Sequence, residues 1–250
     1  MLIEQVLSIG HTVFYFEQTS STNILARNLI ERGASKGSVV YSGNQYAGKG
    51  QGNNLWLSEP NQNLLATVIL IPNQLNPENL FVFNMAVANA VAATVELYAE
   101  VEAFIKWPND IYVNNFKISG LLLESVLFGQ TVKHVCAGIG LNINQIEFPS
   151  TIRATSLKQI NSKDNEVLFV LRELCNQLNN RLEAIDEIRV FEEYNSKLWQ
   201  KNVLMRFLIN ERVVYAKIKS VDYSGKLILS INDEDFSFNH GEIGFLFNEN

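Results

Sequence analysis

An apolar segment over residues 63–71 constrains the fold of this chain more than any other stretch. Its sequence, NLLATVILI, does not alternate between apolar and polar residues, so we expect a strand that is buried on both faces. Residues 77–100 follow as a long helix rich in Ala and Val, and Pro77 opens it. The chain can fill a sizeable core, because 47% of its 250 residues are hydrophobic and 18% are charged. This composition excludes a disordered or fibrous chain.

The segments around this strand and helix alternate between strand-like and helix-like patterns. Before them we expect a strand over residues 12–17, a capped helix that ends near Gly33, and a strand over residues 38–42. After them we expect four strands and then two helices, over residues 103–107, 110–113, 116–128, 131–144, 165–184 and 187–198. The pair Asn114-Asn115 is expected to form a hairpin turn, because Asn tolerates a positive φ.

The character of the chain changes after Trp199. Short β-rich runs fill the remaining residues, and turn signals such as Asn210-Glu211 and Ser224-Gly225 separate them. We therefore predict a mixed α/β domain, of the α+β class, over residues 1–198 and a small β-barrel domain over residues 199–250.

Composition and missing signals argue against several classes of protein. No apolar run approaches the ~18 residues that a membrane span needs, and the first residues lack the features of a signal peptide. Cys136 and Cys175 form neither a disulfide framework nor a metal-ligand pattern, which indicates a reducing, cytoplasmic setting. The net charge of −6 and the pI of about 5.2 argue against a general nucleic-acid binder. The three histidines are too dispersed in sequence to suggest a zinc site.

The most unusual stretch is the loop over residues 48–52, GKGQG, which Asn53 and Asn54 follow. Glycine at every second position lets backbone N–H groups approach a ligand closely, and anions are the usual ligand. A flexible surface loop is the alternative. The run that starts at Gly43 also fits the beginning of a P-loop, but Gly50 stands where that motif needs Ser or Thr. A poor helix start follows, so the P-loop interpretation is disfavoured.

Two polar stretches carry residues that are unusual for their expected place. Pro108 interrupts a strand and puts Asn109 and Asp110 in a turn, where they could face a ligand or form an Asx turn. Lys117 begins an apolar strand. It could neutralise a carboxylate or a phosphate inside a pocket, or it could be solvated at the strand end.

Gly138 and Gly140 lie within a predicted strand, and Asn142 projects beside them. Such glycines mark a place where something lies against the backbone, or else a β-bulge. The chain lacks Gly-x-Ser-x-Gly, His-Glu-x-x-His and clustered carboxylates, so hydrolase and metallopeptidase interpretations have no support.

In this order, the motifs together resemble those of the biotin protein ligases. The most specific part is Lys106-Trp107-Pro108-Asn109-Asp110 followed by Lys117-x-x-Gly120. The other matching positions, which extend the resemblance over most of the chain, are Ser21-Thr22-Asn23, Gln45, residues 48–52, Trp56, Gly138 to Asn142 and His240-Gly241-Glu242-Ile243.

The resemblance implies a fold and an activity. The fold would be a mixed-sheet catalytic domain, related to lipoate ligases and class II synthetases, followed by a Src-homology-3-like β-barrel. The activity would be ATP-dependent formation of biotinyl-5′-AMP. Transfer of the biotin to a lysine of a biotin carboxyl carrier protein domain, in acetyl-CoA carboxylase or a related carboxylase, would follow. Mg²⁺ would arrive with ATP rather than in a dedicated metal site.

The resemblance also assigns residues to biotin. Ser21, Thr22 and Gln45 would hydrogen-bond the head of biotin, with Asn23 in the same polar group. Gly120 would leave room for the ligand.

Lys117 is the implied catalytic residue, placed between the biotin carboxylate and the α-phosphate of ATP. Lys49, Gly50 and Gln51 would fold over biotin and then over the adenylate. Further positions implied in ATP binding are Gly48, Lys49, Trp56 near the adenine, and Asn109 and Asn142 around ATP and its metal.

The chemistry of such a reaction agrees with this set of residues. A carboxylate and a triphosphate must meet, so positioning and charge neutralisation by Lys117, Lys49 and Mg²⁺ would carry most of catalysis. Closing the loop would keep water from a reactive mixed anhydride. Two alternatives stay open: a lipoate or octanoate ligase or transferase, and a non-catalytic module that binds biotin or the carrier domain.

The N-terminal part of the chain departs from some members of that family, which carry a DNA-binding helix-turn-helix domain before the catalytic domain. Here 20 residues precede Ser21, and they resemble a strand and its lead-in. We therefore expect a cytoplasmic ligase that binds neither DNA nor membranes. A homodimer could form by sheet-edge pairing, as in some members, but the sequence identifies no edge.

A second departure concerns the loop, which is usually rich in arginine in that family. Lys49 keeps the charge without the bidentate fork of arginine, and Gln51 loses the charge. We predict that this chain releases biotinyl-adenylate faster than its Gln51→Arg variant does, because arginine adds a charge-assisted contact to phosphate. Release rates measured on preformed adenylate complexes check this. Equal rates in the two proteins would contradict it.

Overall fold

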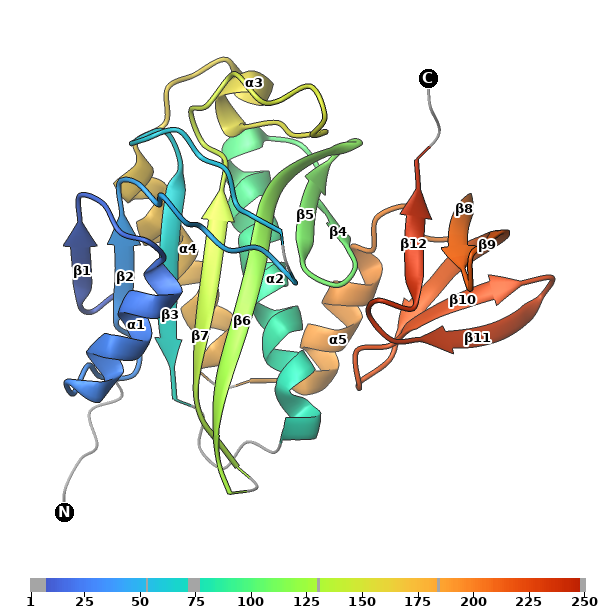
Figure 1. The fold of residues 1–250 in the computed structure, drawn as a ribbon, viewed down its shortest axis with the longest axis horizontal. Coiled ribbons are helices and arrows are strands. Elements are labelled where there is room, and N and C mark those ends of the chain that lie inside the picture. Colours follow the sequence, from blue (N-terminus) through green and yellow to red (C-terminus); the bar gives the residue numbers. More distant parts are fainter. Residues whose placement is uncertain (1–7, 53, 72–76, 130, 184, 248–250) are drawn as a thin grey trace.

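A computed structural model describes residues 8–52, 54–71, 77–129, 131–183 and 185–247 (Figure 1). Residues 1–7 of the expected first domain, Asn53 of the glycine-rich loop and residues 248–250 of the expected barrel lie outside the described residues.

Within the described residues, one sheet of seven strands holds the first part of the chain together. Its order is β1-β2-β3-β7-β6-β5-β4, and every neighbouring pair is antiparallel except β1 and β2, which are parallel. The strands are β1 (Val13–Phe16), β2 (Val39–Ser42), β3 (Leu64–Leu70), β4 (Phe104–Lys106), β5 (Asp110–Val113), β6 (Phe116–Phe128) and β7 (Thr131–Leu141). The predicted turn at Asn114, which has φ of 55°, joins β5 to β6.

Helices cover both faces of this sheet (Figure 1). One face carries α1 (Thr22–Glu31), which contacts β2, β3 and β7. The other face carries α2 (Leu80–Ala99), and α4 (Val167–Leu182) and α5 (Glu187–Ser196) pack on α2. All residues of β3 are therefore buried, as its non-alternating sequence predicts.

The long apolar helix α2 is a core element. It begins at Leu80, after a short 3-10 turn over Pro77–Asn79, slightly later than Pro77 suggests. By length and composition alone α2 could cross a membrane, although Asn84 and Asn89 interrupt its apolar residues. Because 67% of its most apolar window is buried inside the protein, its composition fits a helix packed between a sheet and other helices.

One short helix, α3 (Leu157–Asn161), is absent from the sequence prediction. It spans five residues, too few for a helical period to stand out. Its N-terminus carries a local signal instead, because the Ser156 side chain accepts a hydrogen bond from the Gln159 backbone N–H.

A second antiparallel sheet follows, and its described strands run in the order β11-β10-β9-β8-β12. Its strands are β8 (Leu204–Ile209), β9 (Arg212–Val221), β10 (Leu227–Ile231), β11 (Glu234–Phe238) and β12 (Ile243–Leu246). The predicted turn residues Asn210 and Glu211 have φ of 47° and 62° and join β8 to β9. The fold class is thus confirmed, while the domain boundary between residues 198 and 199 stays a prediction.

The second sheet is tied to the first part of the chain by buried polar contacts. Asn195 of α5 donates to the Val221 carbonyl at 3.1 Å and accepts from the Val221 N–H at 2.7 Å. Trp107 donates from Nε1 to the Gly225 carbonyl at 2.9 Å. Gly225 has φ of 87°, and a Cβ there would lie 2.4 Å from the Phe81 ring, so only glycine fits this turn. The barrel is therefore held against the turn that contains Trp107.

We predict that Asn195→Ala lowers the free energy of unfolding by about 2 kcal/mol, because the buried N–H and carbonyl of Val221 lose their partner. Urea denaturation followed by circular dichroism measures the change. Ser196→Ala is the matched control, since its exposed hydroxyl bonds only within α5, and we expect a change within about 0.5 kcal/mol. Equal stability of wild type and Asn195→Ala would contradict this account of the interface.

Candidate active site

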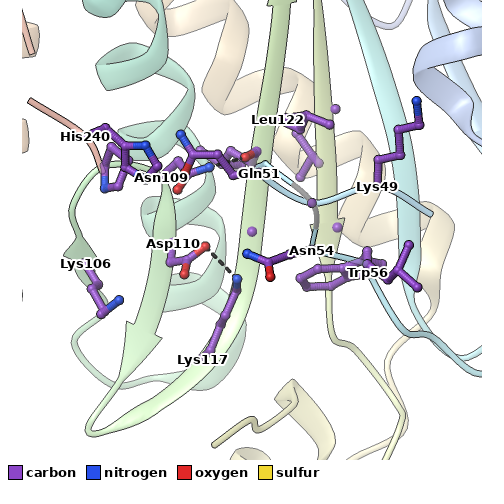
Figure 2. Close-up of a pocket in the computed structure, with 18 of the residues that line it drawn as sticks. Lys49, Gln51, Asn54, Trp56, Lys106, Asn109, Asp110, Lys117, Leu122 and His240 are labelled. Carbon is purple, nitrogen blue, oxygen red and sulfur yellow. Dashed lines mark hydrogen bonds and ion pairs between the residues drawn. The ribbon is translucent and has the colours of Figure 1, made fainter. Parts of the chain in front are cut away.

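A cavity of about 350 Å³ opens where α1 begins, above strands β6 and β7 (Figure 2). Its walls come from the start of α1, the glycine-rich loop, the Lys106–Asp110 turn, β6, β7 and the barrel. The residues assigned from sequence that line it are Ser21, Thr22, Asn23, Gln45, Lys49, Gly50, Gln51, Trp56, Asn109, Lys117 and Gly120. A second cavity of about 560 Å³, lined by Leu80 and Phe81 of α2, shares Gln51, Pro108, Asn109 and Leu122 with it.

The floor of the cavity is a strip of strand surface without side chains. Gly120 of β6 pairs with Gly140 of β7, and Gly138 lies two residues away on the same face. A Cβ at Gly140 would lie 2.4 Å from the Trp56 ring, and a Cβ at Gly138 would lie 2.5 Å from Asn23 Oδ1. The expectation that something lies against these glycines therefore holds, and in this structure it is Trp56 and Asn23.

Gly120 likewise has other side chains packed close to where its own Cβ would be. A Cβ there would lie 3.0 Å from the Trp56 ring and 3.2 Å from Lys117 Nζ. The room that its missing side chain leaves is shared by these two side chains.

The glycine-rich loop folds back on itself beside the floor. Gly50 donates from its N–H to the Asn54 carbonyl at 2.8 Å, and Trp56 donates to the Gly48 carbonyl at 3.0 Å. A Cβ at Gly48 would lie 2.8 Å from the Trp56 carbonyl, so Gly48 permits this close return. The described residues that follow are extended rather than helical, which agrees with rejecting a P-loop.

Lys117 and Asp110 form an ion pair inside the cavity, with Nζ and Oδ1 2.6 Å apart (Figure 2). The β5–β6 hairpin pairs Lys117 with Tyr112, and Asp110 lies two residues from Tyr112 on the same face of β5, so the two side chains can meet. The Lys117 ammonium also lies 5.6 Å from the centre of the Trp56 ring. Figure 2 shows Lys49 across the loop from this pair, so the two lysines occupy different parts of the cavity.

Lys106, which sequence reasoning left unassigned, also lines the cavity. Its Nζ lies 4.4 Å from the centre of the Phe245 ring and 5.8 Å from that of Tyr112. Burial lowers the pKa of Lys106, nearby Asp110 raises it, and Lys117 lowers it further. The motif that contains Lys106 pointed to a site in the sequence. The contact between Lys106 and Phe245, however, depends on how the second sheet packs against the first.

His240 is a second residue that sequence reasoning left without a role. It lies in the turn before β12, lines the cavity, and has its ring centre 5.8 Å from that of Trp107. Asp110 is a third lining residue without an assigned role, and the signal for it was its place in the same motif as Asn109.

The polar groups at the start of α1 have a definite arrangement. Gln45 Oε1 accepts from the Thr22 N–H at 2.7 Å, which leaves Gln45 Nε2 as the donor of that amide. Ser21 precedes the helix in an extended conformation and is buried. These side chains form one polar wall of the cavity.

Asn109 and Asn142 differ in position. Asn109 donates from Nδ2 to the Leu121 carbonyl and lines the cavity. Asn142 is 3% exposed, donates to the Thr155 carbonyl at 3.0 Å, and does not line the cavity. Its Oδ1 is buried with no hydrogen-bond partner among the described residues. The structure thus does not bring Asn142 or Gly48 to the cavity surface with the other assigned residues.

Comparisons with known proteins point to one family. A sequence model of the Biotin/lipoate A/B protein ligase family matches residues 15–142. The bifunctional ligase/repressor BirA of Bacillus subtilis is 29% identical over 242 residues, which cover 90% of this chain and 71% of BirA. The human biotin–protein ligase is 34% identical over 146 residues, which cover 56% of this chain and 20% of the human protein.

Solved structures share the fold. The biotin protein ligase from Aquifex aeolicus, in complex with biotin and ATP, superposes with a TM-score of 0.79 at 24% identity, covering 95% of this chain and all of that one. The biotin protein ligase from Leishmania major, in complex with biotinyl-5-AMP, gives a TM-score of 0.67 at 23% identity, covering 92% and 99%.

We predict that Gly140→Ala expels the Trp56 ring from the floor of the cavity, because the new Cβ would overlap it. Acrylamide quenching of tryptophan fluorescence measures this, and we expect stronger quenching, since Trp107 and Trp199 stay buried. Gly244→Ala in β12 is the matched control, because its Cβ would only reach ordinary contact at 3.4 Å from Leu208. Unchanged quenching in a folded Gly140→Ala protein would contradict the packing described.

Proposed function

The chain belongs to the biotin/lipoate A/B protein ligase family, and from this premise we propose that it is a biotin protein ligase. It activates biotin with ATP to biotinyl-5′-AMP and transfers the biotin to a lysine of a biotin carboxyl carrier protein domain. The single observation that carries the proposal is the meeting, in one cavity, of the Thr22–Gln45 polar wall with the Lys117–Asp110 pair.

The polar wall suits the head of biotin better than that of lipoate. A ureido ring offers two N–H donors and one carbonyl acceptor. Gln45 Nε2 can donate to such a carbonyl, because Gln45 Oε1 is already held by Thr22. The dithiolane ring of lipoate has no hydrogen-bond donor, and it would leave this wall without partners.

The adenylation step joins two anions. An oxygen of the biotin carboxylate attacks the α-phosphorus of ATP, and the bond to the β-phosphate oxygen breaks to release pyrophosphate. Lys117 is proposed to lie between carboxylate and α-phosphate, where its ammonium offsets their repulsion and the charge that develops in the transition state. Asp110 holds Lys117 in place from 2.6 Å.

In the transfer step, the amine of the acceptor lysine attacks the carbonyl carbon of the mixed anhydride, and AMP leaves. The folded glycine-rich loop, with Lys49, Gly50 and Gln51 at the cavity, is proposed to cover the adenylate and to exclude water.

ATP is proposed to enter as its magnesium complex. Within the residues that the structure describes, no group of three or more His, Cys, Asp or Glu side chains could hold a metal ion. Asn109 offers a carbonyl oxygen at the cavity, the hard donor that Mg²⁺ accepts beside phosphate oxygens and water. This oxygen donor of Asn109 fits a metal that would arrive on the triphosphate.

The barrel over residues 199–250, proposed as a separate domain, supplies part of the cavity wall through His240 and Phe245. We further propose that the acceptor is a carrier domain of a carboxylase and that the enzyme acts in the cytoplasm. A homodimer, formed with a second copy of the chain, is also part of the proposal.

We predict pyrophosphate release from MgATP that requires biotin and does not occur with lipoate or without acid. Lys117→Ala should lower this rate by about 10²–10³-fold, because a preorganised cation at the reacting groups is lost. Lys133→Ala, an exposed lysine of β7, is the control and should keep the wild-type rate. Pyrophosphate release with lipoate alone would show that biotin is not the substrate. Biotin binding without pyrophosphate release would support a non-catalytic binding module instead.

A further inference from the structure

Behind the polar wall, a chain of hydrogen bonds runs from Thr22 to a carboxylate that the cavity does not touch. Glu124 of β6 accepts from Asn23 Nδ2 at 2.8 Å, and Arg27 Nη2 lies 3.5 Å from the same carboxylate oxygen. Neither Glu124 nor the next link, Thr67, lines the cavity, whereas Thr22 and Asn23 do. The chain thus connects a surface carboxylate to the substrate side of the wall.

Glu124 fixes the orientation of the Asn23 amide. An ionised carboxylate and a backbone carbonyl can only accept hydrogen bonds. The two acceptors at Asn23 Nδ2 are Glu124 Oε2 at 2.8 Å and the Leu122 carbonyl at 3.2 Å. Nδ2 must therefore face them, and Oδ1 must face Thr67.

The next links follow from the single hydrogen of each hydroxyl. Thr67 Oγ1 donates toward Asn23 Oδ1 at 2.6 Å and toward Thr22 Oγ1 at 2.8 Å, so its one hydrogen lies between two acceptors. Thr22 Oγ1 in turn donates to Gln45 Oε1 at 3.1 Å, and the same oxygen accepts from the Thr22 N–H at 2.7 Å.

The direction of the chain decides what the cavity offers to a ligand. With its hydrogen turned toward Gln45 and one lone pair toward Thr67, Thr22 keeps a second lone pair for the cavity and can accept from an N–H group. Gln45 Nε2 beside it presents hydrogens. One acceptor next to one donor complements an N–H beside a C=O, which is the edge of a ureido or amide group.

The three residues between Glu124 and the cavity are buried, which gives the direction of the chain weight. Asn23 is 3% exposed, Thr22 4% and Thr67 0%, so water cannot replace a lost partner. Gly138 keeps the space for this arrangement, because a Cβ there would lie 2.5 Å from Asn23 Oδ1.

We propose that Glu124 is a positioning residue for substrate recognition: by orienting the Asn23–Thr67–Thr22 chain, it holds Thr22 in place to accept from an N–H of the substrate head. The inference rests on the proposed function for the identity of the substrate, and it adds a residue remote from the ligand. Glu124 acts through Asn23 and touches neither substrate.

Calorimetry of biotin binding tests this, together with the KM of MgATP in the pyrophosphate assay. Glu124→Met removes the acceptor and should weaken biotin binding about tenfold, the loss of one well-formed hydrogen bond to a charged partner, while the KM of MgATP changes less than twofold. Glu124→Gln should restore binding to within about threefold of wild type, because its carbonyl oxygen can still accept from Asn23.

Arg27→Met is the matched control. It removes the ion pair on the exposed side of Glu124 but leaves the carboxylate bonded to Asn23, so biotin binding should stay within twofold. Equal losses in Arg27→Met and Glu124→Met would overturn the proposal, because the ion pair rather than the chain would then matter.

Thr67→Val breaks the same chain of hydrogen bonds at a buried residue, and it provides the test if Glu124→Met does not fold. It should also weaken biotin binding, with the KM of MgATP unchanged. Binding within twofold of wild type in Glu124→Met, or in Thr67→Val where the first is unfolded, would overturn the inference. A wild-type protein that binds no biotin would instead contradict the proposed function, before any variant is considered.

Discussion

The missing side chains at Gly120, Gly138 and Gly140 are the constraint on which the site depends. These positions are neighbours on the paired strands β6 and β7, so the middle of the sheet presents a flat strip to the cavity. Side chains from elsewhere occupy that strip: Trp56 lies against Gly120 and Gly140, and Asn23 against Gly138. The loop and the first turn of α1 are thereby brought within contact distance of a rigid sheet, which fixes them more closely than loop-to-loop contacts could.

Two lysines in the cavity are stabilised by different means. Lys117 has a carboxylate at 2.6 Å, so its charge is balanced before any substrate enters. Lys106 lies among aromatic rings, which attract a cation but do not neutralise it, and burial lowers its pKa. Lys106 thus brings less compensated positive charge to the cavity than Lys117 does, on the side that β12 closes.

The regular elements were within reach of sequence reasoning because they depend on local pattern. Periodicity and turn residues predict the apolar run of β3, the turn at Asn114 and the β-rich character of the described chain after Trp199. It was harder to predict which residues from distant elements meet in the cavity. The motif containing Lys106 pointed to a site, but its contact with Phe245 joins residues from two sheets and has no local signal. The same holds for Glu124: its sequence places it in an apolar strand, and only the structure shows that Asn23 donates a hydrogen bond to it. The resemblance to a family grouped most of the cavity residues that spacing alone could not.

The walls of the cavity come from both ends of the described chain. Thr22 begins its first helix and Ser21 directly precedes it, whereas Phe245 belongs to β12, its last strand. Contacts over such a sequence separation form late, because a long stretch of chain must be ordered before its ends can meet. During synthesis, which proceeds from the N-terminus, the large sheet can fold while the barrel strands are still in the ribosome. A nascent chain would then carry the polar wall around Thr22 before it has the aromatic wall around Lys106. The cavity is therefore complete only after β12 has left the ribosome and packed beside the large sheet.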